Sequence, residues 1–179
     1  MWINPANLQT FTTHSEIRSE FSHVSFPAEM TESDIEYVGL LPVTLTAQPE
    51  FDRRIEKVVE LTPIAVDGTW MQQWAVVTLD ATEQSAMAVQ IQSEIVTATQ
   101  QRLDDFAKTR NYDSILSACT YATDANPKFS AEGQYCVGAR GATWTKLAEM
   151  LAEVQANTRP MPSGYADIES ELPPLVWPN

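Results

Sequence analysis

The class of fold follows from one stretch, RIEKVVELTPIAVDGTWMQQWAVVTL, which runs from Arg54 to Leu79. Two runs rich in β-branched and aromatic residues flank the dipeptide Asp67-Gly68. This dipeptide suits a two-residue type I′ turn, in which both central residues need a positive φ angle. The stretch therefore predicts an antiparallel β-hairpin with strands over 54–66 and 69–79.

The turn also predicts a register for the two strands, because the pairs can be counted outward from Val66 opposite Thr69. The count places six residues on one mainly apolar face, paired as Ala65–Trp70, Leu61–Trp74 and Val59–Val76. Pro63 cannot donate a hydrogen bond to a ladder. We therefore expect the first strand to lie at a sheet edge or to carry a bulge at Pro63.

Short helices and one extended piece are expected before the hairpin. His14 to Phe21 could make two helical turns. Thr31 can cap a second helix, which Gly39 then stops. Residues 41–45 are predicted to be extended, with Pro42 marking them as an edge strand at best. Residues 1–80 are thus expected to form a small part that contains both helices and strands.

A long helix is predicted after the hairpin, because Asp80 is a good N-cap and Glu83 completes a capping-box arrangement. The helix is expected to end near Asn111. Its apolar residues form two stripes, the first of Met87, Ile91, Ile95, Ala98 and Phe106, the second of Val89, Val96 and Leu103. Two stripes favour a helix that buries one side against its own domain and the other against a partner. An ordinary core helix with one wide apolar face is the alternative.

Two further helices are expected, so that residues 81–157 form a helical part. The first covers 112–122, with Asp113 as its cap. The second runs from about Pro127 to Ala156, and its later half carries four apolar residues on one side: Trp144, Leu147, Leu151 and Val154. Its earlier half contains three glycines, Gly133, Gly138 and Gly141. Glycine weakens a helix, so these residues indicate either close approach of another helix or a local break.

Residues 158–179 are expected to form a proline-rich arm. Its prolines preclude a continuous helix, although Tyr165 to Leu172 could make a turn or two. The end of the arm, Pro173 to Pro178, is predicted to be extended, and its apolar content indicates that it docks on something. The sequence as a whole predicts an α+β protein.

The charge balance excludes some classes of partner. The chain has 24 acidic and 11 basic residues, a formal net charge of -13. Such an excess disfavours binding to a nucleic-acid backbone or to an anionic membrane surface. Solubility is the simplest reason for the acidity, and a specific basic partner is the alternative.

The sequence also gives an expectation for location. No segment approaches the roughly 18 consecutive apolar residues of a membrane span. The start, Met1 to Pro5, lacks the basic and apolar regions of a secretory signal. We expect a protein that is made in the cytoplasm of its host and kept there until assembly.

No residue pattern points to catalysis, a metal or a cofactor. The two histidines, His14 and His23, have no cysteine or carboxylate cluster near them at metal-ligand spacing. Cys119 and Cys136 lack the context of a nucleophile and are expected to be buried thiols. The stretch 136–141 lacks the spacing of a phosphate-binding loop. The prediction is a protein without catalytic residues and without a cofactor.

Paired carboxylates would point to a carbohydrate hydrolase, because two carboxylates can cleave a glycosidic bond. Asp104 and Asp105 are adjacent on a predicted helix and point about 100° apart, which indicates a solvated face. A carbohydrate hydrolase is therefore only a third alternative.

Partner contacts are expected where large apolar residues stand at chain ends or on the second stripe of the long helix. Trp177 could dock on its own domain or anchor a partner, and Trp2 is similar. Tryptophans 70, 74 and 144 are expected to be core. We expect Trp177→Ala to weaken partner binding more than it lowers the melting temperature. The candidate partner-binding residues are Trp177, Val176, Leu175, Trp2, Val89 and Val96.

A series of fragments resembles small tail proteins that are encoded beside tail-fibre genes in tailed phages and prophages. In the C-terminal half they are YDSILSA at 112–118, Asn126-Pro127, the helix with Trp144, RPMP at 159–162, Leu172-Pro173 and Trp177-Pro178. In the N-terminal half they are THSEIR at 13–18, VSFP at 24–27 and VDGTW at 66–70. The resemblance covers most of the chain.

The resemblance implies a structural or adaptor role in the virion tail, without catalysis. Tail-fibre or baseplate proteins in a multi-chain assembly are the implied partners. An ending in Trp-Pro is also similar to tail-fibre assembly proteins. That similarity implies the alternative of a chaperone, which is absent from the finished particle or bound only at the fibre tip.

Overall fold

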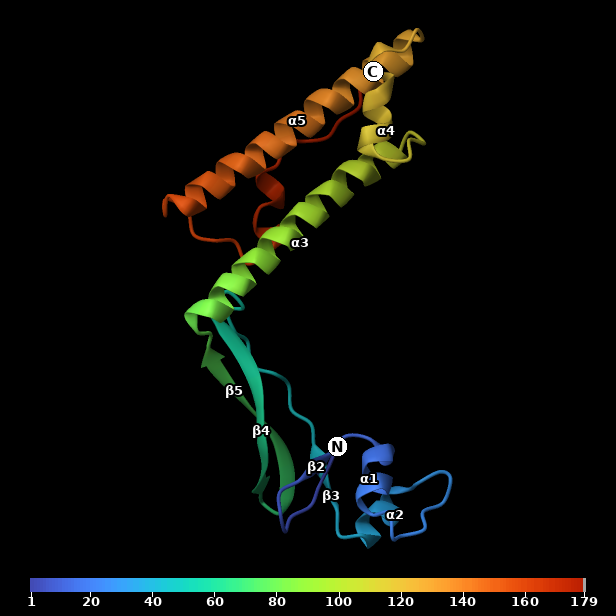
Figure 1. Ribbon diagram of the computed structural model, residues 1–179, viewed down its shortest axis with the longest axis vertical. Helices are drawn as coiled ribbons and strands as arrows, with labels where there is room; N and C mark the ends of the chain where they lie inside the picture. Colours follow the sequence, from blue (N-terminus) through green and yellow to red (C-terminus); the bar gives the residue numbers. More distant parts are fainter. Residues whose placement is uncertain (179) are drawn as a thin grey trace. The chain divides into compact units, whose positions relative to one another are not determined.

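The computed structural model describes residues 1–178 and divides the chain into two compact units, which meet at the bond between Asp80 and Ala81. The strands belong to the first unit and the long helices to the second (Figure 1). The expected α+β class is confirmed.

The first unit contains a five-stranded sheet. Its strands are β1 (Trp2–Ile3), β2 (Thr10–Phe11), β3 (Leu41–Thr44), β4 (Glu56–Val66) and β5 (Thr69–Thr78). They lie in the order β2-β1-β3-β5-β4, and all neighbours are antiparallel except β3 and β5, which are parallel. The hairpin of β4 and β5 is confirmed, and β4 is an edge strand.

The prediction that Pro42 marks an edge strand is wrong, because β3 lies between β1 and β5. Val43 donates its N–H to the carbonyl of Met1 (3.0 Å), and Pro42 faces Trp2. Successive residues of a strand direct their N–H and C=O groups to opposite neighbouring strands. Since Val43 bonds to β1, β1 requires no N–H from Pro42. Pairing with β5 begins only at Val43. The missing donor therefore interrupts neither ladder.

A bulge in β4 corrects the predicted register of the hairpin. Near the turn the expected pairs Val66–Thr69 and Ala65–Trp70 are present. Between Leu61 and Ile64 the register shifts, so that Leu61 faces Gln73 and not Trp74. Two residues of β4, one of them Pro63, then stand against one residue of β5, as in a β-bulge.

The bulge redistributes side chains between the two faces, because a shift of one residue reverses every later side chain. Trp70, Trp74 and Val76 stay on one face, which we call the tryptophan face. Val59 and Leu61 turn to the other side. There they join Ile64 and Val66 of β4 and Val77 of β5 in what we call the aliphatic face. The two tryptophans, expected to be core, are half-buried.

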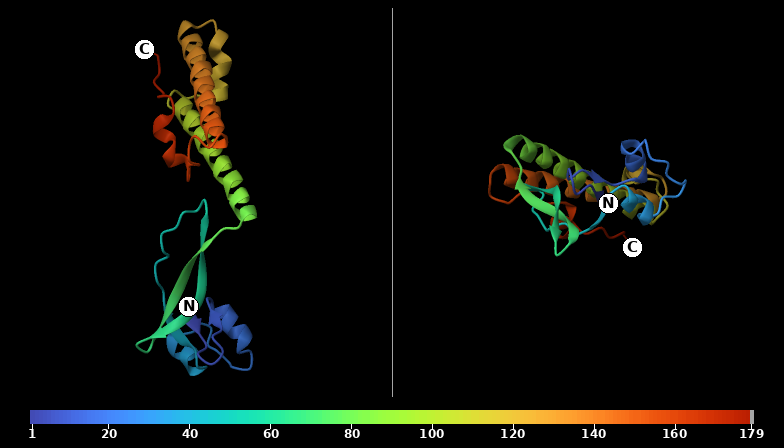
Figure 2. Two further views of the ribbon diagram at one scale, coloured as in Figure 1. Left: turned by 90° about the vertical axis from the view of Figure 1, so that its left-hand side faces the viewer. Right: turned by 90° about the horizontal axis from the view of Figure 1, so that it is seen from below.

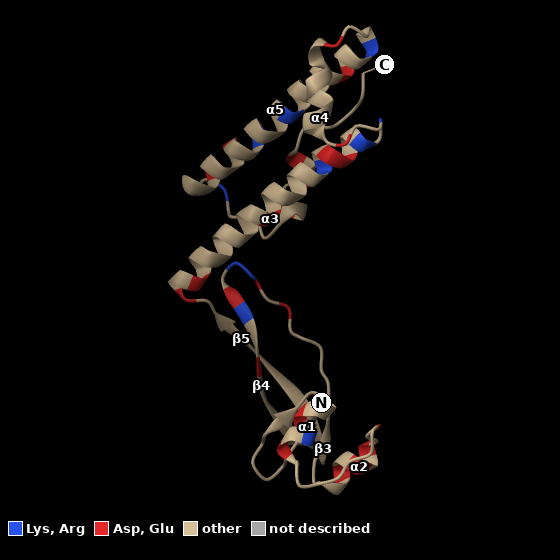
Figure 3. Ribbon diagram, turned by 45° about the vertical axis from the view of Figure 1, so that its right-hand side comes forward, with Lys and Arg blue, Asp and Glu red and all other residues tan. Residues whose placement is uncertain are grey.

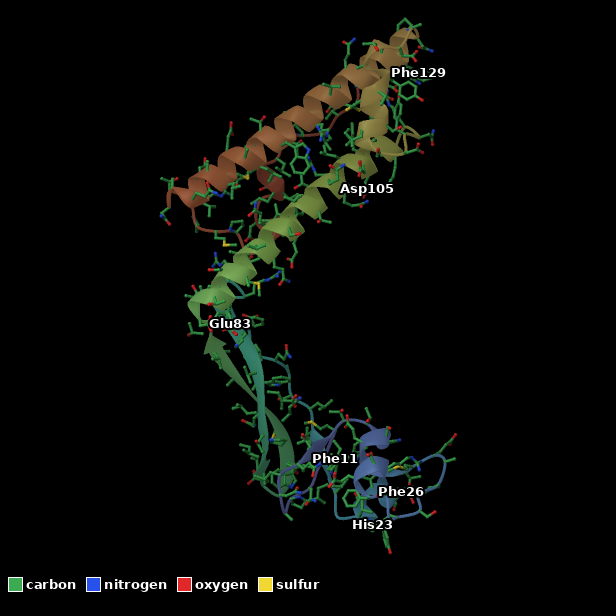
Figure 4. The ribbon with its side chains drawn as sticks, in the orientation of Figure 1. Phe11, His23, Phe26, Glu83, Asp105 and Phe129 are labelled. Atoms are coloured by element: carbon green, nitrogen blue, oxygen red, sulfur yellow. The ribbon has the colours of Figure 1, made fainter. Side chains whose placement is uncertain are left out.

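Two short helices complete the first unit. They are α1 (His14–Glu20) and α2 (Glu32–Tyr37), each begun by a threonine in a capping box. Five buried residues form the core between helices and strands: Phe11, Ile17, Met30, Ile35 and Leu40. In Figure 4 the side chains of Phe11 and Phe26 lie beside α1. The capping prediction for Thr31 is confirmed, since its hydroxyl accepts the N–H of Asp34 (3.4 Å).

The second unit is built on two long helices, α3 (Ala81–Lys108) and α5 (Pro127–Gln155). The chain between them forms α4 (Ile115–Cys119) and the 3-10 helix η1 (Thr120–Thr123), so the helix predicted over 112–122 is shorter and changes type. Its cap is Ser114, not Asp113, because the Ser114 hydroxyl accepts the N–H of Ser117.

Only one of the three glycines in α5 marks a close approach. A Cβ atom on Gly133 would lie 2.3 Å from the backbone nitrogen of Ala122, whereas Gly138 and Gly141 face open space. The helix continues through all three, so the alternative of a local break is wrong.

The proline-rich arm returns along α3 and α5 (Figure 2, left). It contains the two expected turns, the 3-10 helices η2 (Tyr165–Asp167) and η3 (Glu169–Glu171). Ile168 and Leu172 pack with Ile91, Ile95 and Met150 in one core cluster. Leu103, Ala107, Tyr112, Ile115, Ala118 and Cys136 form a second core cluster nearer the end of the arm.

Candidate interaction surfaces

Trp177 docks on its own unit, in an aromatic cage at the end of α3. Its ring stacks on Phe106, with centroids 4.3 Å apart and an interplanar angle of 17°. The indole Nε1 donates to the hydroxyl of Thr109 (2.8 Å). The guanidinium carbon of Arg110 lies 4.9 Å from the centre of the ring, in a cation–π contact. Of the two positions open for Trp177, the structure shows the intrachain one.

Hydrogen bonds between helix side chains and the backbone of the arm hold the rest of the arm. Arg102 donates to the carbonyl of Pro173 (2.8 Å), and the hydroxyl of Tyr135 accepts the N–H of Val176 (2.7 Å). Leu175 is half-buried against the neighbouring core cluster. Val176 is different, because its side chain remains exposed. Its side chain is therefore the most accessible part of the predicted contact on the arm.

A buried carboxylate positions the arginine of the cage. Glu132 of α5 is nearly inaccessible and accepts hydrogen bonds from Arg110 and from the hydroxyl of Tyr112 (2.7 Å for the tyrosine). Burial raises the pKa of Glu132, but these two donors outweigh it, so the pKa is lowered and the carboxylate stays charged. Burial and the neighbouring Glu132 raise the pKa of Tyr112 to about 12. No local sequence pattern indicates this pair, since Arg110 lies in the turn after α3 and Glu132 lies on α5.

The cysteines lie beside this network without the character of nucleophiles. Cys136 is fully buried, as expected, and burial raises the pKa of its thiol to about 11. Cys119 is half-buried, and burial raises its pKa too. Because the thiolate is the nucleophilic form, neither side chain is prepared for covalent chemistry near neutral pH.

An apolar groove of about 460 Å³ opens between α3, α5 and the arm. Val89 and Val96 lie on its α3 side, together with Ala88, Ile91, Gln92 and Ile95. The lining from the other segments is also apolar in the main, with Trp144, Leu147, Leu151, Val154, Met161 and Ile168. The stripe predicted on α5 and the second stripe of α3 therefore meet at one surface, which neither pattern alone indicated.

The valines of this groove are accessible. Val89 is 68% exposed and Val96 is 42% exposed, whereas Leu103, the third member of the predicted stripe, is fully buried in the core. Charged residues are scarce along this part of α3, and Figure 3 shows its first half almost entirely in tan. Arg159, the one charged residue of the lining, forms ion pairs with Glu153 and Glu171.

Trp2, the remaining candidate for partner binding, lies in the first unit. It is half-buried against the N-terminal core, and its ring centre is 5.4 Å from that of His14. The structure thus places the six candidates at three separate places, with Val89 and Val96 in the groove, residues 175–177 on the docked arm and Trp2 beside β1.

Asp104 is not part of a solvated pair, which corrects the prediction. Its carboxylate accepts the N–H of Ile115 at the start of α4 (2.8 Å), so it joins α3 to α4. Asp105, labelled in Figure 4, is exposed and forms an ion pair with Lys108 (3.1 Å). Within the described residues, no group of three or more His, Cys, Asp or Glu side chains gathers as metal ligands would.

Within residues 1–178, no helix has the length and apolar character needed to cross a bilayer. Comparison with known proteins adds no relative: no family model, curated protein or solved structure matches this chain.

Proposed function

We propose that this chain is a non-enzymatic tail protein of a tailed phage, an adaptor that holds a tail-fibre or baseplate protein. Two independent lines support the proposal. The first is the resemblance of ordered sequence fragments, from residues 13–18 to Trp177-Pro178, to small tail proteins. The second is physical, since the accessible apolar surfaces of the chain suit protein contacts.

The groove of the second unit is the observation that carries the proposal. Exposed valines on a helix with few charges line one side, and Leu147, Leu151 and Val154 line the other. Depletion of charge at an apolar centre is the composition of protein–protein interfaces. An amphipathic helix of a partner would place its apolar side chains in such a groove.

The aromatic cage gives a supporting role to the arm. The arm closes one side of the groove through Met161 and Ile168, and Trp177 fastens its end. Loss of the fastening would loosen a groove wall. The arm thus contributes to partner binding through the shape of the groove, even where its tryptophan is docked in its own chain.

Co-expression with the neighbouring tail-fibre protein tests the proposal. We expect the purified complex to survive gel filtration, and Val89→Lys to weaken it by about tenfold or more, because a charge enters the apolar groove. Val137→Lys is the matched control, since Val137 is 50% exposed on α5 but does not line the groove. Failure of the fibre and baseplate proteins to bind the unaltered chain would contradict the proposal, as would glycan turnover by the purified protein.

An assembly chaperone is the second candidate, favoured by the Trp177-Pro178 ending. Mass spectrometry of purified particles separates the two roles. A stoichiometric amount of this chain supports the virion component. Its absence, together with a fibre that is soluble only when co-expressed with it, supports the chaperone.

A further inference from the structure

The face of α5 that lines the groove begins with an arginine. At spacings of three or four residues this face carries Arg140, Trp144, Leu147, Leu151 and Val154. The last four line the groove, and Arg140 lies one helical turn before them. Residues at this spacing are neighbours on the surface of a helix. The groove therefore ends, beyond Trp144, beside a guanidinium group.

Three buried hydrogen-bond donors near this end have no acceptor among residues 1–178. They are the Nε of Arg140, the Nε1 of Trp144 and the hydroxyl of Thr99. Most buried polar groups in proteins have a hydrogen-bond partner, because an unsatisfied one costs free energy. A guanidinium or an indole N–H can only donate, so these groups require an acceptor. We call Thr99, Arg140 and Trp144 the donor end of the groove.

Thr99 belongs to this end although it lies on α3. The helices α3 and α5 run in opposite directions (Figure 1). One turn before Thr99, Ile95 shares a core cluster with Met150, and one turn after it, Leu103 shares a core cluster with Cys136. Thr99 therefore lies across from the part of α5 between Cys136 and Met150, which contains the other two donors.

The charge of Arg140 is not neutralised by its own chain. Within the described residues, no carboxylate forms an ion pair with Arg140, although the chain has a net charge of -13. At the other end of the groove, Arg159 forms ion pairs with Glu153 and Glu171. Arg140 is half-buried, where an unpaired charge is costly. An anionic group on an occupant would thus find an unpaired cation at the donor end and a paired one at the far end.

We propose that the occupant of the groove is a partner helix with a carboxylate at one end of its apolar face, and that this carboxylate binds Arg140. The apolar side chains of the helix pack against Val89 and Leu151. The carboxylate oxygens accept charge-assisted hydrogen bonds at the donor end. This inference rests on the proposed function and adds the chemistry and the placement of the partner, whose acidic residue lies near Trp144 and whose far end lies near Arg159.

Two model peptides test the inference on the full chain. Each is an amphipathic helix of about 18 residues with leucines at helical spacing. One has a glutamate at the end of its apolar face, and its twin has a glutamine there. Fluorescence anisotropy of the labelled peptides is expected to show about tenfold tighter binding of the glutamate peptide. The net charge of the chain repels that peptide, so a preference for it reports a local cation.

Variants of α5 assign the preference to one residue. Arg140→Met removes the cation and should bring the two peptides within about twofold of each other. Arg140→Lys keeps the charge and should keep part of the preference. Lys146→Met is the matched control, because it removes the same charge from α5 at a residue that does not line the groove. The full preference is expected to persist in that variant.

The stability of the chain without peptide separates a binding role for Arg140 from a structural one. Arg140→Met is expected to raise the melting temperature by about 2–5 °C, because an unpaired, half-buried charge is replaced by an apolar side chain. A lower melting temperature would show that Arg140 stabilises its own unit, and would overturn the inference. Equal binding of the two peptides, binding of neither, or a preference that survives Arg140→Met would also overturn it. The fibre protein is absent from this experiment, so co-expression still decides the proposed function separately.

Discussion

At the scale of single residues, two buried contacts in the second unit join segments that are distant in the chain. Glu132 on α5 joins Arg110 and Tyr112, and Gly133 beside it lets η1 approach the helix. One contact depends on charge and the other on the absence of a side chain. Each therefore leads to a different prediction.

Replacement of Glu132 by glutamine should destabilise the unit by about 2 kcal/mol, because Arg110 loses its partner charge in a largely buried place. The lowered pKa of Glu132 means that its stabilising effect is complete above the ordinary glutamate pKa. That effect is lost as the pH falls through the lowered pKa. The difference between the two proteins in urea unfolding should thus be largest near neutral pH and shrink on acidification.

The control for this change is Glu149→Gln on the exposed side of the same helix, with an expected effect within about 0.5 kcal/mol. An equal loss of stability in both variants, or a difference that grows on acidification, would argue against a structural role for the buried pair.

A second prediction concerns the glycines of α5. Gly133→Ala should cost about 1–3 kcal/mol, because its Cβ would lie 2.3 Å from the Ala122 backbone nitrogen, which cannot move aside as a flexible side chain would. Gly138→Ala meets no atom within 4 Å and should gain up to about 1 kcal/mol from helix propensity. Urea unfolding of the two variants checks the opposite signs. A gain at both positions would show that η1 does not pack closely on α5.

At the scale of elements, the arm and the hairpin each have a conformation that the local sequence predicts and contacts that it does not predict. The arm was expected to be extended and docked, and it crosses beside both long helices before Trp177 enters the cage. The hairpin was expected from Asp67-Gly68, but its bulge decided which residues share a face. The sequence thus predicts the extended arm and the turn of the hairpin, but not the helices that the arm packs against or the residues that share a face of the hairpin.

The arm leads to a third prediction. Trp177→Ala should lower the stability of the second unit by about 2 kcal/mol, since a stacked ring, a hydrogen bond and a cation–π contact are lost together. Thr109→Ala removes only the hydrogen-bond partner and should cost about 1 kcal/mol. Thermal unfolding and fibre binding should be measured on the same samples. Reduced binding by Trp177→Ala at a temperature where it remains folded would support the original expectation of partner anchoring. An unchanged melting temperature would contradict the docked position.

At the scale of the whole molecule, each unit presents an accessible apolar surface. In the first unit it is the aliphatic face of the hairpin, and in the second it is the groove with Val89 and Val96. The proposed adaptor role would require separate sites for its contacts, and two compact units allow each site to change without disturbing the other core.

The sequence by itself determined the local structure of this protein. The Asp67-Gly68 turn, the threonine caps of the short helices and the long uninterrupted run after Asp80 depend on bonds between residues a few positions apart, so their signals are readable in order along the chain. Only the tertiary structure decided which surfaces meet. The bulge opposite Gln72 reverses half of the hairpin, and Val89 lines one groove with Leu147 and Leu151. Arg110, in the turn after α3, contacts Glu132 on α5. These pairings depend on packing between distant segments, in which a shift of one residue or one helical turn changes every contact, and no local pattern encodes that choice.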